Sequence, residues 1–303
     1  MKKIYVLEHF DFTEEQKNRL NALGKVKYYE KANQEQIDEA IEYADAILLD
    51  WLDPDPILEK IKKDQFICLP YTGYDWIKNI DVAKLRGGVI SNTPNYSTNA
   101  VAEHHLALIL DCAKHVSIFN DSYKTGEKVP FIRGKELFGK TMGIIGLGNI
   151  GKRLAELLKV FDVKILTYNR TPKKLPHIQD VELEYLLKNS DVVCVTCKLT
   201  SETRGLIGKQ ELELMKSDAI LTSTTGGVVN LNDLDDFLDK NSLFGVGLDD
   251  VDQQQVPKNL LKQENLVCTY HRAYDTNESE NNRINLCIDN IEAFLKGKPI
   301  NKI

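Results

Sequence analysis

Three glycines in one short stretch are the residues whose types and spacing say most about chemistry. Gly146, Gly148 and Gly151 form a G-x-G-x-x-G pattern between an apolar run at residues 142–145 and a segment with apolar residues at helical spacing. Strand, glycine turn and helix in this order are the context of a dinucleotide fingerprint. There the glycines admit a pyrophosphate to the backbone and the helix N-terminus faces its charge. The stretch therefore predicts a dinucleotide cofactor; the alternative is a glycine-rich turn without a ligand.

The end of the next predicted strand indicates which dinucleotide binds. Residues 163–168 read as a strand, and Asn169, Arg170 and Thr171 follow it, with Lys173 and Lys174 close behind. NAD sites usually carry Asp or Glu at this strand end, to accept from the ribose 2′-hydroxyl. Here the strand end has no carboxylate, and Arg170 offers a fork of donors suited to a 2′-phosphate. We therefore expect NADP(H) as the preferred cofactor, with NAD(H) as the alternative if the basic residues form only a solvated loop.

Length and composition exclude several classes of protein. The chain has 303 residues, of which 42% are hydrophobic and 28% charged, and its net charge is -6. These values fit a globular protein of two domains without a basic nucleic-acid-binding surface. No apolar run is long enough to cross a membrane, and the N-terminus reads as a first strand and not as a signal peptide. Cytoplasmic location is therefore expected, with neither nucleic acid nor membrane as a partner.

The elements that must position the glycine stretch alternate between strand and helix. Before it, strands are predicted at residues 4–7, 26–29, 46–49 and 66–69 with helices between them, which indicates an α/β fold with a parallel sheet. A long apolar helix at residues 99–113 looks like a connector between domains. After the stretch, strands are predicted at residues 191–197, 219–223, 244–248 and 266–269, and a last amphipathic helix covers residues 281–295.

The cysteines do not suggest a metal site. Cys194 and Cys197 form a C-x-x-C inside a predicted strand, where the two thiols would point to opposite faces. No second pair or histidine cluster completes a zinc site, so no metal is expected and the six cysteines are interpreted as reduced thiols.

Several segments, in order along almost the whole chain, resemble the D-isomer-specific 2-hydroxyacid dehydrogenase family. They are residues 72–75 (Thr-Gly-Tyr-Asp), 99–103, 139–151, 199–207, 247–249 (Gly-Leu-Asp) and 269–271 (Thr-Tyr-His). The resemblance implies two Rossmann-like, doubly wound parallel-sheet domains with a cleft between them. A flavodoxin-like substrate domain would comprise residues 1–98 and 277–303, and an NAD(P)-binding Rossmann domain residues 99–276. It also implies a homodimer and a small carbonyl or 2-hydroxy acid substrate.

The same resemblance implies contacts for the cofactor and the substrate. Thr72, Gly73 and Tyr74 would face the substrate, and Lys198 is one cation that could help bind it, with Arg272 as another; either could equally be a solvated surface charge. Asp249 would hold the nicotinamide side of the cofactor. The remaining cofactor-binding positions are Gly146, Gly148, Asn149, Ile150, Gly151, Asn169, Arg170, Thr171, Cys197, Thr203, Thr224 and His271.

The catalytic set of the family is a histidine acid/base, a carboxylate that orients it, and an arginine that clamps the substrate carboxylate. His271 matches the histidine, although an ordinary surface or core histidine is the alternative. The arginine position holds Thr225 and the glutamate position holds Gln254. Thr225 offers one neutral hydroxyl where arginine would make two charge-assisted bonds, and Gln254 adds no charge beside His271.

Two functions remain open from the sequence. The first is an NAD(P)-dependent oxidoreductase in which His271 donates the proton while hydride passes from NADPH to a small 2-oxo acid or related carbonyl. The second is a non-catalytic NADP(H)-binding sensor or interaction protein that kept the fold. Thr225 and Gln254 favour the second; the glycines, Arg170 and His271 favour the first.

Overall fold

The structure is a computed structural model, and it describes residues 1–173 and 175–303. The chain divides into two compact units. Unit 1 consists of Met1–Ser97 with Thr276–Ile303, and unit 2 consists of Thr98–Asp275. Each is a parallel α/β sheet with helices on both faces, so the predicted fold class is confirmed.

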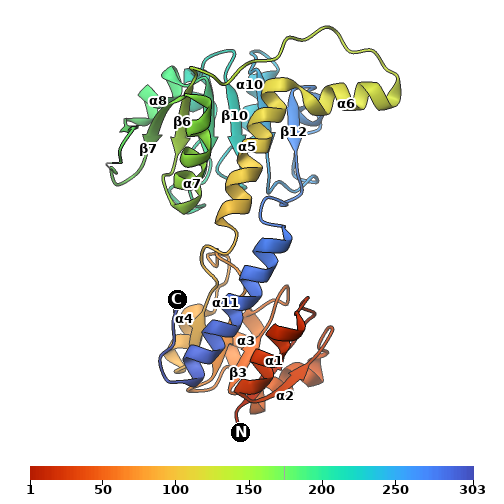
Figure 1. Cartoon of the computed structure of the whole chain (residues 1–303), viewed down its shortest axis with the longest axis vertical. Coiled ribbons are helices and arrows are strands. Elements are labelled where there is room, and N and C mark those ends of the chain that lie inside the picture. The colour runs from red at the N-terminus through yellow and green to blue at the C-terminus, as the bar shows by residue number, and fades with distance from the viewer. Residues whose placement is uncertain (174) are drawn as a thin grey trace. The chain divides into compact units, whose positions relative to one another are not determined.

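Unit 1 holds a five-stranded sheet in the order β2-β1-β3-β4-β5 (Figure 1). Its strands are β1 (Lys3–Val6), β2 (Lys25–Tyr28), β3 (Ala46–Leu48), β4 (Phe66–Cys68) and β5 (Val89–Ser91). Its helices are α1 (Glu14–Leu23), α2 (Gln34–Tyr43), α3 (Asp55–Lys60), α4 (Ile80–Leu85) and α11 (Asn277–Leu295). Every pairing is parallel, and in register Ile4 lies beside Val26 and Ala46. This strand order is the flavodoxin-like one.

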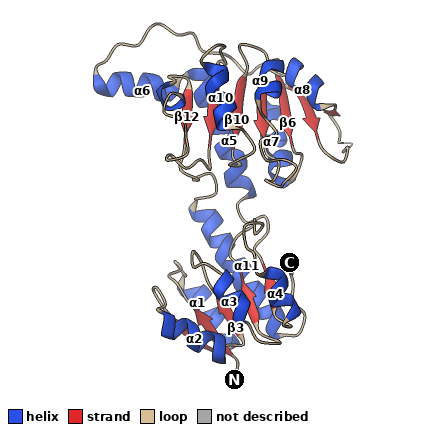
Figure 2. Ribbon diagram, turned by 180° about the vertical axis from the view of Figure 1, so that it is seen from behind, coloured by secondary structure: helices blue, strands red, loops and turns tan. Residues whose placement is uncertain are grey.

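Alternate residues of the strands build the two cores of unit 1. Ile4 and Val6 pack with α1 and α11, whereas Tyr5 packs with α2, α3 and α4, because successive side chains of a strand point to opposite faces. Figure 2 shows the strands of each sheet between helices. The last helix does return to the first sheet, and it begins at Asn277, because the hydroxyl of Thr276 caps it by accepting from Ser279 N.

Unit 2 holds a seven-stranded sheet in the order β12-β11-β10-β9-β6-β7-β8. Its strands are β6 (Thr141–Ile145), β7 (Lys164–Tyr168), β8 (Ile178–Asp180), β9 (Val192–Val195), β10 (Ile220–Ser223), β11 (Gly245–Leu248) and β12 (Leu266–Cys268). Its α-helices are α5 (Thr98–Lys114), α6 (Val116–Thr125), α7 (Asn149–Leu158), α8 (Leu183–Asn189), α9 (Lys209–Leu214) and α10 (Leu231–Leu238), and two 3₁₀ turns cover Lys159–Phe161 and Leu260–Lys262. The strand order is that of a Rossmann sheet, and it reverses between β6 and β9, where such sheets bind ligands.

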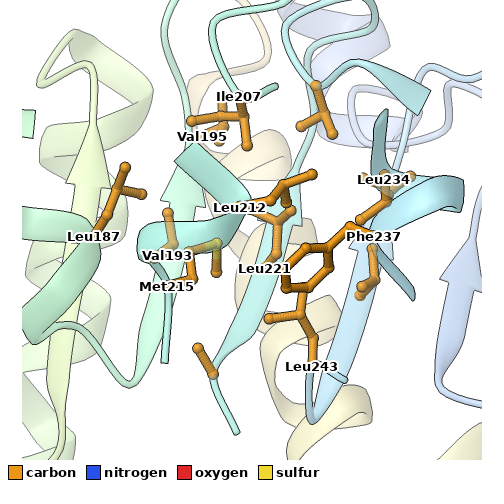
Figure 3. Close-up of a cluster of buried hydrophobic side chains, with 14 of the residues drawn as sticks. Leu187, Val193, Val195, Ile207, Leu212, Met215, Leu221, Leu234, Phe237 and Leu243 are labelled. Carbon is orange, nitrogen blue, oxygen red and sulfur yellow. The ribbon is translucent and has the colours of Figure 1, made fainter. Parts of the chain in front are cut away.

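The sheet of unit 2 is buried on both faces. Val192 and Cys194 of β9 pack with α5 and α7, while Val193 and Val195 face the helices α8, α9 and α10. Figure 3 shows the second of these cores, where Leu212 and the neighbouring side chains of α8 and α10 cover Val193 and Leu221. A strand covered on both faces must be apolar throughout, which explains the unbroken Val192–Val195 run.

Two elements of unit 2 were not expected from the sequence pattern. β8 is a short edge strand beside β7, and α6 extends from the end of α5 at His115, whose left-handed backbone (φ 55°) separates the two helices. α6 has no buried residue, and its apolar side chains Val116, Phe119 and Tyr123 are exposed. Within residues 1–173 and 175–303 no helix has the length and apolarity that crossing a bilayer requires.

Candidate active site

The glycine turn joins β6 to α7 and leaves room at its centre. Gly146 has φ 99°, and a Cβ there would lie 2.6 Å from the backbone of Cys197, so only glycine fits. A Cβ on Gly151 would lie 2.3 Å from Gly146 O. At Gly148, by contrast, no atom of the described residues lies within 4 Å of the Cβ position, and no side chain caps α7 there.

The N-terminus of α7 is therefore an anion site in geometry. Asn149 and Ile150 lie in its first turn. Backbone N–H groups in the first turn have no carbonyl group of the same helix to which they can donate. The helix dipole and the N–H groups of the first turn favour a phosphate at that end. The space beside Gly148 is thus suited to a pyrophosphate, and the turn contains the predicted cofactor positions Gly146 to Gly151.

Asn169, just after β7, is tied to the turn and to a neighbouring carboxylate. Its Oδ1 accepts from Leu147 N at 2.5 Å and its Nδ2 donates to Asp180 Oδ1 at 3.0 Å. Asp180, on β8, also accepts from Thr167 Oγ1 at 3.1 Å. The end of β7 itself carries no carboxylate, but the parallel pairing of β7 and β8 brings Asp180 beside it, which the sequence pattern did not reveal.

The basic residues after β7 also have partners. Arg170 is 83% exposed and its Nη1 lies 2.6 Å from Glu202 Oε2, in the loop after β9. Lys173 Nζ donates to Leu147 O at 2.7 Å, which places an ammonium group directly against the glycine turn. Thr171 is exposed next to Arg170. Lys174 lies outside the described residues.

The loop after β9 holds the predicted positions Cys197, Lys198 and Thr203. Thr203 Oγ1 donates to Lys198 O at 2.6 Å and accepts from Thr200 N at 2.8 Å, which closes the loop on itself. Cys197 packs against Gly146, and burial raises the pKa of its thiol to about 11. The thiol therefore stays protonated at neutral pH and serves packing here.

Asp249, at the end of β11, is buried and organises the loop that follows β12. Its Oδ1 accepts from Thr269 Oγ1 at 2.6 Å and Arg272 N at 2.8 Å, and its Oδ2 accepts from Ala273 N at 3.0 Å. These bonds shape residues 269–273, the loop that carries His271. The predicted nicotinamide contact of Asp249 remains a prediction, while the structure gives this side chain a positioning role.

Asp250, the next residue, contacts His271. His271 Nδ1 lies 3.2 Å from Asp250 Oδ1, with the two side chains 55% and 39% exposed. Asp250 Oδ2 accepts from Gly226 N at 3.1 Å. Both Asp250 (φ 61°) and His271 (φ 52°) have left-handed backbones, which non-glycine residues rarely adopt outside places where the fold enforces them. The pair is therefore held by its surroundings at some cost in backbone strain.

The carboxylate that contacts His271 is Asp250, whereas the orienting role predicted for Gln254 stays a prediction. Gln254 is exposed; its backbone N donates to Asp252 Oδ1 at 3.0 Å, and in the described part of the chain its side chain makes no hydrogen bond to His271. Asp250 supplies a carboxylate that family spacing does not reveal. The sequence signal was the Asp249–Asp250 pair itself, but which of the two reaches His271 depends on the positive φ of Asp250.

Thr225 lies in the turn after β10, beside this pair. Its backbone N donates to Ser223 Oγ at 3.3 Å, and its neighbour Gly226 packs so closely on Asp250 that a Cβ would lie 2.3 Å from Asp250 O. Thr224 and Thr225 are half-buried. The turn thus holds Asp250 through a backbone N–H and offers neutral hydroxyls where the family motif has a guanidinium.

Two histidines of α5 lie behind the His271 loop, and the sequence analysis did not single them out. His104 Nε2 lies 3.0 Å from Thr269 Oγ1. His105 is buried, with Nδ1 3.2 Å from Thr222 Oγ1 and Nε2 3.2 Å from Val195 O. Burial lowers the pKa of His105 to about 4, so it is neutral at physiological pH. Their signal was two adjacent histidines on an otherwise apolar helix.

The predicted substrate residues Thr72, Gly73 and Tyr74 belong to unit 1, whereas Lys198 and every other predicted site residue belong to unit 2. Thr72 Oγ1 donates to Thr93 O at 3.1 Å, and Asn92 Nδ2 donates to Thr72 O at 2.9 Å. Gly73 is exposed, with no atom of the described chain within 4 Å of its Cβ position, and Tyr74 is half-buried against the core of unit 1. Of the two candidate cations, Arg272 pairs with Asp275 at 2.6 Å, and Lys198 also has an interaction partner.

Comparisons with known proteins agree with this geometry. Residues 106–273 match the family model described as D-isomer specific 2-hydroxyacid dehydrogenase, NAD binding domain. The chain is 30% identical to a hydroxypyruvate reductase of Blautia hydrogenotrophica, covering 94% of this chain and 93% of that protein. It is 36% identical to a glyoxylate reductase of Thermococcus litoralis, covering 80% and 77%. Among solved structures, an acyclic imino acid reductase (Bsp5) in complex with NADPH and D-Arg is similar, with a TM-score of 0.87, 28% identity and 100% coverage of both chains.

Proposed function

Because the chain belongs to the D-isomer-specific 2-hydroxyacid dehydrogenase family, we propose that it is an NADPH-dependent reductase of a small 2-oxo acid or a related carbonyl compound. The observation that carries this proposal is the contact of His271 Nδ1 with Asp250 Oδ1 at 3.2 Å, at the sheet edge that also carries the glycine turn. A histidine oriented by a carboxylate is the arrangement that general acid catalysis requires.

In this mechanism the chain positions one proton. A nicotinamide cofactor whose pyrophosphate binds at the glycine turn would supply the hydride. Asp250 accepts a hydrogen bond from His271 Nδ1–H, which fixes the ring and leaves Nε2 as the proton donor toward the carbonyl oxygen. Gly226 N–H holds the other oxygen of Asp250, so the acid is supported through two successive bonds. Such a positioned acid contributes about 10²–10⁴-fold to the rate.

The substrate class follows from the relatives and from Thr225. The relatives named glyoxylate reductase and hydroxypyruvate reductase support small 2-oxo acids. Thr225 cannot replace the two charge-assisted bonds of an arginine, so a substrate carboxylate would depend on other donors, such as the backbone N–H groups of residues 72–74. Weak anchoring of a carboxylate also leaves room for carbonyl compounds that lack one. The Bsp5 structure adds imino acids to the candidates that should be assayed.

NADP(H) is the preferred cofactor in this proposal, and NAD(H) the weaker alternative. Arg170 and Lys173 bring two positive charges next to Asn169 and the glycine turn, which suits a 2′-phosphate. Arg170→Ala should therefore weaken NADPH binding and leave NADH binding nearly unchanged, as fluorescence titration of both cofactors would measure. Equal affinity of the parent protein for NADPH and NADH would contradict the preference.

A homodimer is the proposed assembly, and the features of α6 support it. Figure 1 shows α6 and the loop after it extending away from the sheet of unit 2. Tyr123 (90% exposed) and Phe131 (86% exposed) leave apolar surface on this arm, and a cavity of about 540 Å³ at its base is lined by His115, Ile118 and Phe244 among others. In a two-fold dimer the arm of each copy can cover the other copy. Sedimentation should show a dimer that Tyr123→Ser with Phe131→Ser weakens; a monomeric parent at micromolar concentration would contradict it.

The decisive experiment for the function is a rate measurement. NADPH oxidation should be followed with glyoxylate, hydroxypyruvate, larger 2-oxo acids, simple ketones, and 2-oxo acids mixed with ammonia or methylamine to form imines. The parent should turn over at least one class, and His271→Gln should lose about 10²–10⁴-fold of that rate while still binding NADPH. NADPH binding without turnover of any of these compounds would favour the alternative, a non-catalytic NADP(H)-binding protein.

A further inference from the structure

The contact between Arg170 and Glu202 joins two loops at the cofactor edge of unit 2. Arg170 follows β7 and Glu202 follows β9, so the two strands on either side of β6 contribute one partner each. Arg170 Nη1 lies 2.6 Å from Glu202 Oε2, and both side chains are largely exposed, at 83% and 65%. The contact is thus an open ion pair beside the glycine turn and not a buried structural bridge.

Glu202 is held in place by the loop that carries it. Its backbone N donates to Thr200 Oγ1 at 3.2 Å, and Arg204 N donates to Thr200 O at 3.0 Å. Gly205 N then donates to Gly227 O at 2.8 Å, which anchors the loop to the turn after β10. The backbone of Glu202 is therefore anchored beside Arg170, while its exposed side chain can move away from the guanidinium.

Arg170 and Lys173 differ in the group that binds the cation of the side chain. Lys173 Nζ donates to a backbone carbonyl, Leu147 O, which carries no net charge. Arg170 is bound by a full negative charge, the kind of group that a 2′-phosphate presents to a guanidinium. Any phosphate that binds Arg170 must therefore compete with Glu202.

We propose that Glu202 is a specificity-determining residue that occupies Arg170 in the cofactor-free protein and is displaced by the 2′-phosphate of NADP(H). This inference rests on the proposed role of Arg170 in NADP(H) binding. It adds a competitor, Glu202, that limits how tightly Arg170 binds the 2′-phosphate. Because an exposed ion pair is weak, displacement is readily reversible and costs only a part of the phosphate affinity. A ligand without the 2′-phosphate leaves the pair intact and is bound independently of Glu202.

The test uses 2′,5′-ADP and 5′-AMP, which differ only in the 2′-phosphate. Isothermal titration should be made with the parent, Glu202→Gln, Arg170→Gln, and the double variant. Glu202→Gln should tighten 2′,5′-ADP by about two- to fivefold and leave 5′-AMP unchanged. In the Arg170→Gln background the same substitution should have no effect, because Glu202 acts by occupying Arg170. Glu213→Gln, which removes an exposed charge elsewhere in unit 2, is the matched control and should change neither affinity.

The outcomes separate this inference from the cofactor preference itself. If the parent binds 2′,5′-ADP more tightly than 5′-AMP but Glu202→Gln changes nothing, the competition is wrong and the preference stands. If Glu202→Gln tightens 2′,5′-ADP equally with and without Arg170, Glu202 acts by general repulsion and the proposal is overturned. If the parent binds both nucleotides equally, the NADP(H) preference fails, and with it the proposal.

Discussion

The two units end their parallel strands in different ways, although both are doubly wound sheets. At the carboxyl edge of unit 1, Glu8 follows β1 and accepts from the backbone N of Asp50 at 2.6 Å and of Leu52 at 2.8 Å. Asp50 follows β3 and pairs with Arg283 of α11 at 2.5 Å. At the carboxyl edge of unit 2, β6 ends in an open glycine turn, and Asp250 after β11 contacts a half-exposed histidine.

The difference suggests why one edge suits the phosphates of a dinucleotide and the other does not. In unit 1 the chain's own carboxylate takes up N–H groups that could bind an anion, and the remaining charges neutralise one another in the interior. In unit 2 the corresponding positions have a helix N-terminus without a side-chain cap, space beside Gly148, and charges that face solvent. Charged residues at a sheet edge therefore indicate function where their pairs stay open to solvent, and stability where the pairs are buried.

The largest expected effect comes from breaking the charge cluster of unit 1. Burial raises the pKa of Asp50 even with Arg283 beside it, so the ion pair adds no net stability to the fold. Removing Asp50 alone nevertheless destabilises the fold, because it leaves the buried guanidinium of Arg283 with less compensating negative charge. Asp50→Asn should cost about 3 kcal/mol of unfolding free energy, the low end for such losses because Glu280 still binds Arg283. Both tryptophans, Trp51 and Trp76, lie in unit 1, so denaturation followed by tryptophan fluorescence reports on it.

The exposed carboxylate Asp38 provides the control for that experiment. Asp38→Asn makes the same charge change at the surface of unit 1 and should change the unfolding free energy little. NADPH affinity should be the same in all three proteins. Equal stability of Asp50→Asn and Asp38→Asn would contradict the conclusion that the charges at the carboxyl edge of unit 1 neutralise one another in the interior.

The next effect concerns the open turn of unit 2. Gly148 has an ordinary backbone (φ -75°), and space for a side chain is present in the described structure, so Gly148→Val should fold. The new side chain would occupy the pyrophosphate position, and NADPH affinity should fall by about 100-fold or more, since phosphate contact with the backbone requires glycine there. Calorimetric titration and a thermal scan together check this. Unchanged NADPH affinity in a folded Gly148→Val protein would contradict binding of the cofactor at this turn.

A smaller effect is expected from the buried histidine of unit 2. His105 has a folded pKa of about 4, below the ordinary 6.5 of the unfolded chain, because burial disfavours its charged form. The unfolded chain therefore binds more protons between these values, so stability that is present above pH 6.5 is lost as pH falls toward 4, by about 2 kcal/mol at pH 5. His105→Gln keeps partners for Thr222 and Val195 and should flatten this acid limb.

Hydrogen exchange of unit 2 peptides at pH 7 and pH 5 would measure the effect of His105→Gln. His177→Gln, a change at an exposed histidine of the same unit, should leave the pH dependence as in the parent. If the stability of His105→Gln falls as steeply between pH 7 and pH 5 as that of the parent, groups other than His105 cause the loss.

Sequence reasoning predicted the fold because the fold depends on pattern. Strand–turn–helix order, the three glycines and the segments shared with the family specify two doubly wound sheets, and the comparisons confirm family and fold. The site was less predictable. Asp250 reaches His271 through a left-handed backbone, Asp180 reaches Asn169 from the neighbouring strand, and Glu202 reaches Arg170 from the far side of β6, which no local spacing records. Gln254 was chosen by counting along a motif, and the loop places it elsewhere.

The most direct test of the account compares Asp250 with Gln254. On whichever substrate the parent reduces, Asp250→Asn should lower kcat/KM by about tenfold or more, a part of the ~10²–10⁴-fold supplied by a positioned acid. Gln254→Ala should leave kcat/KM nearly unchanged, and NADPH affinity should be the same in both variants. A large loss in Gln254→Ala with full activity in Asp250→Asn would contradict the central claim that Asp250 is the carboxylate that orients His271.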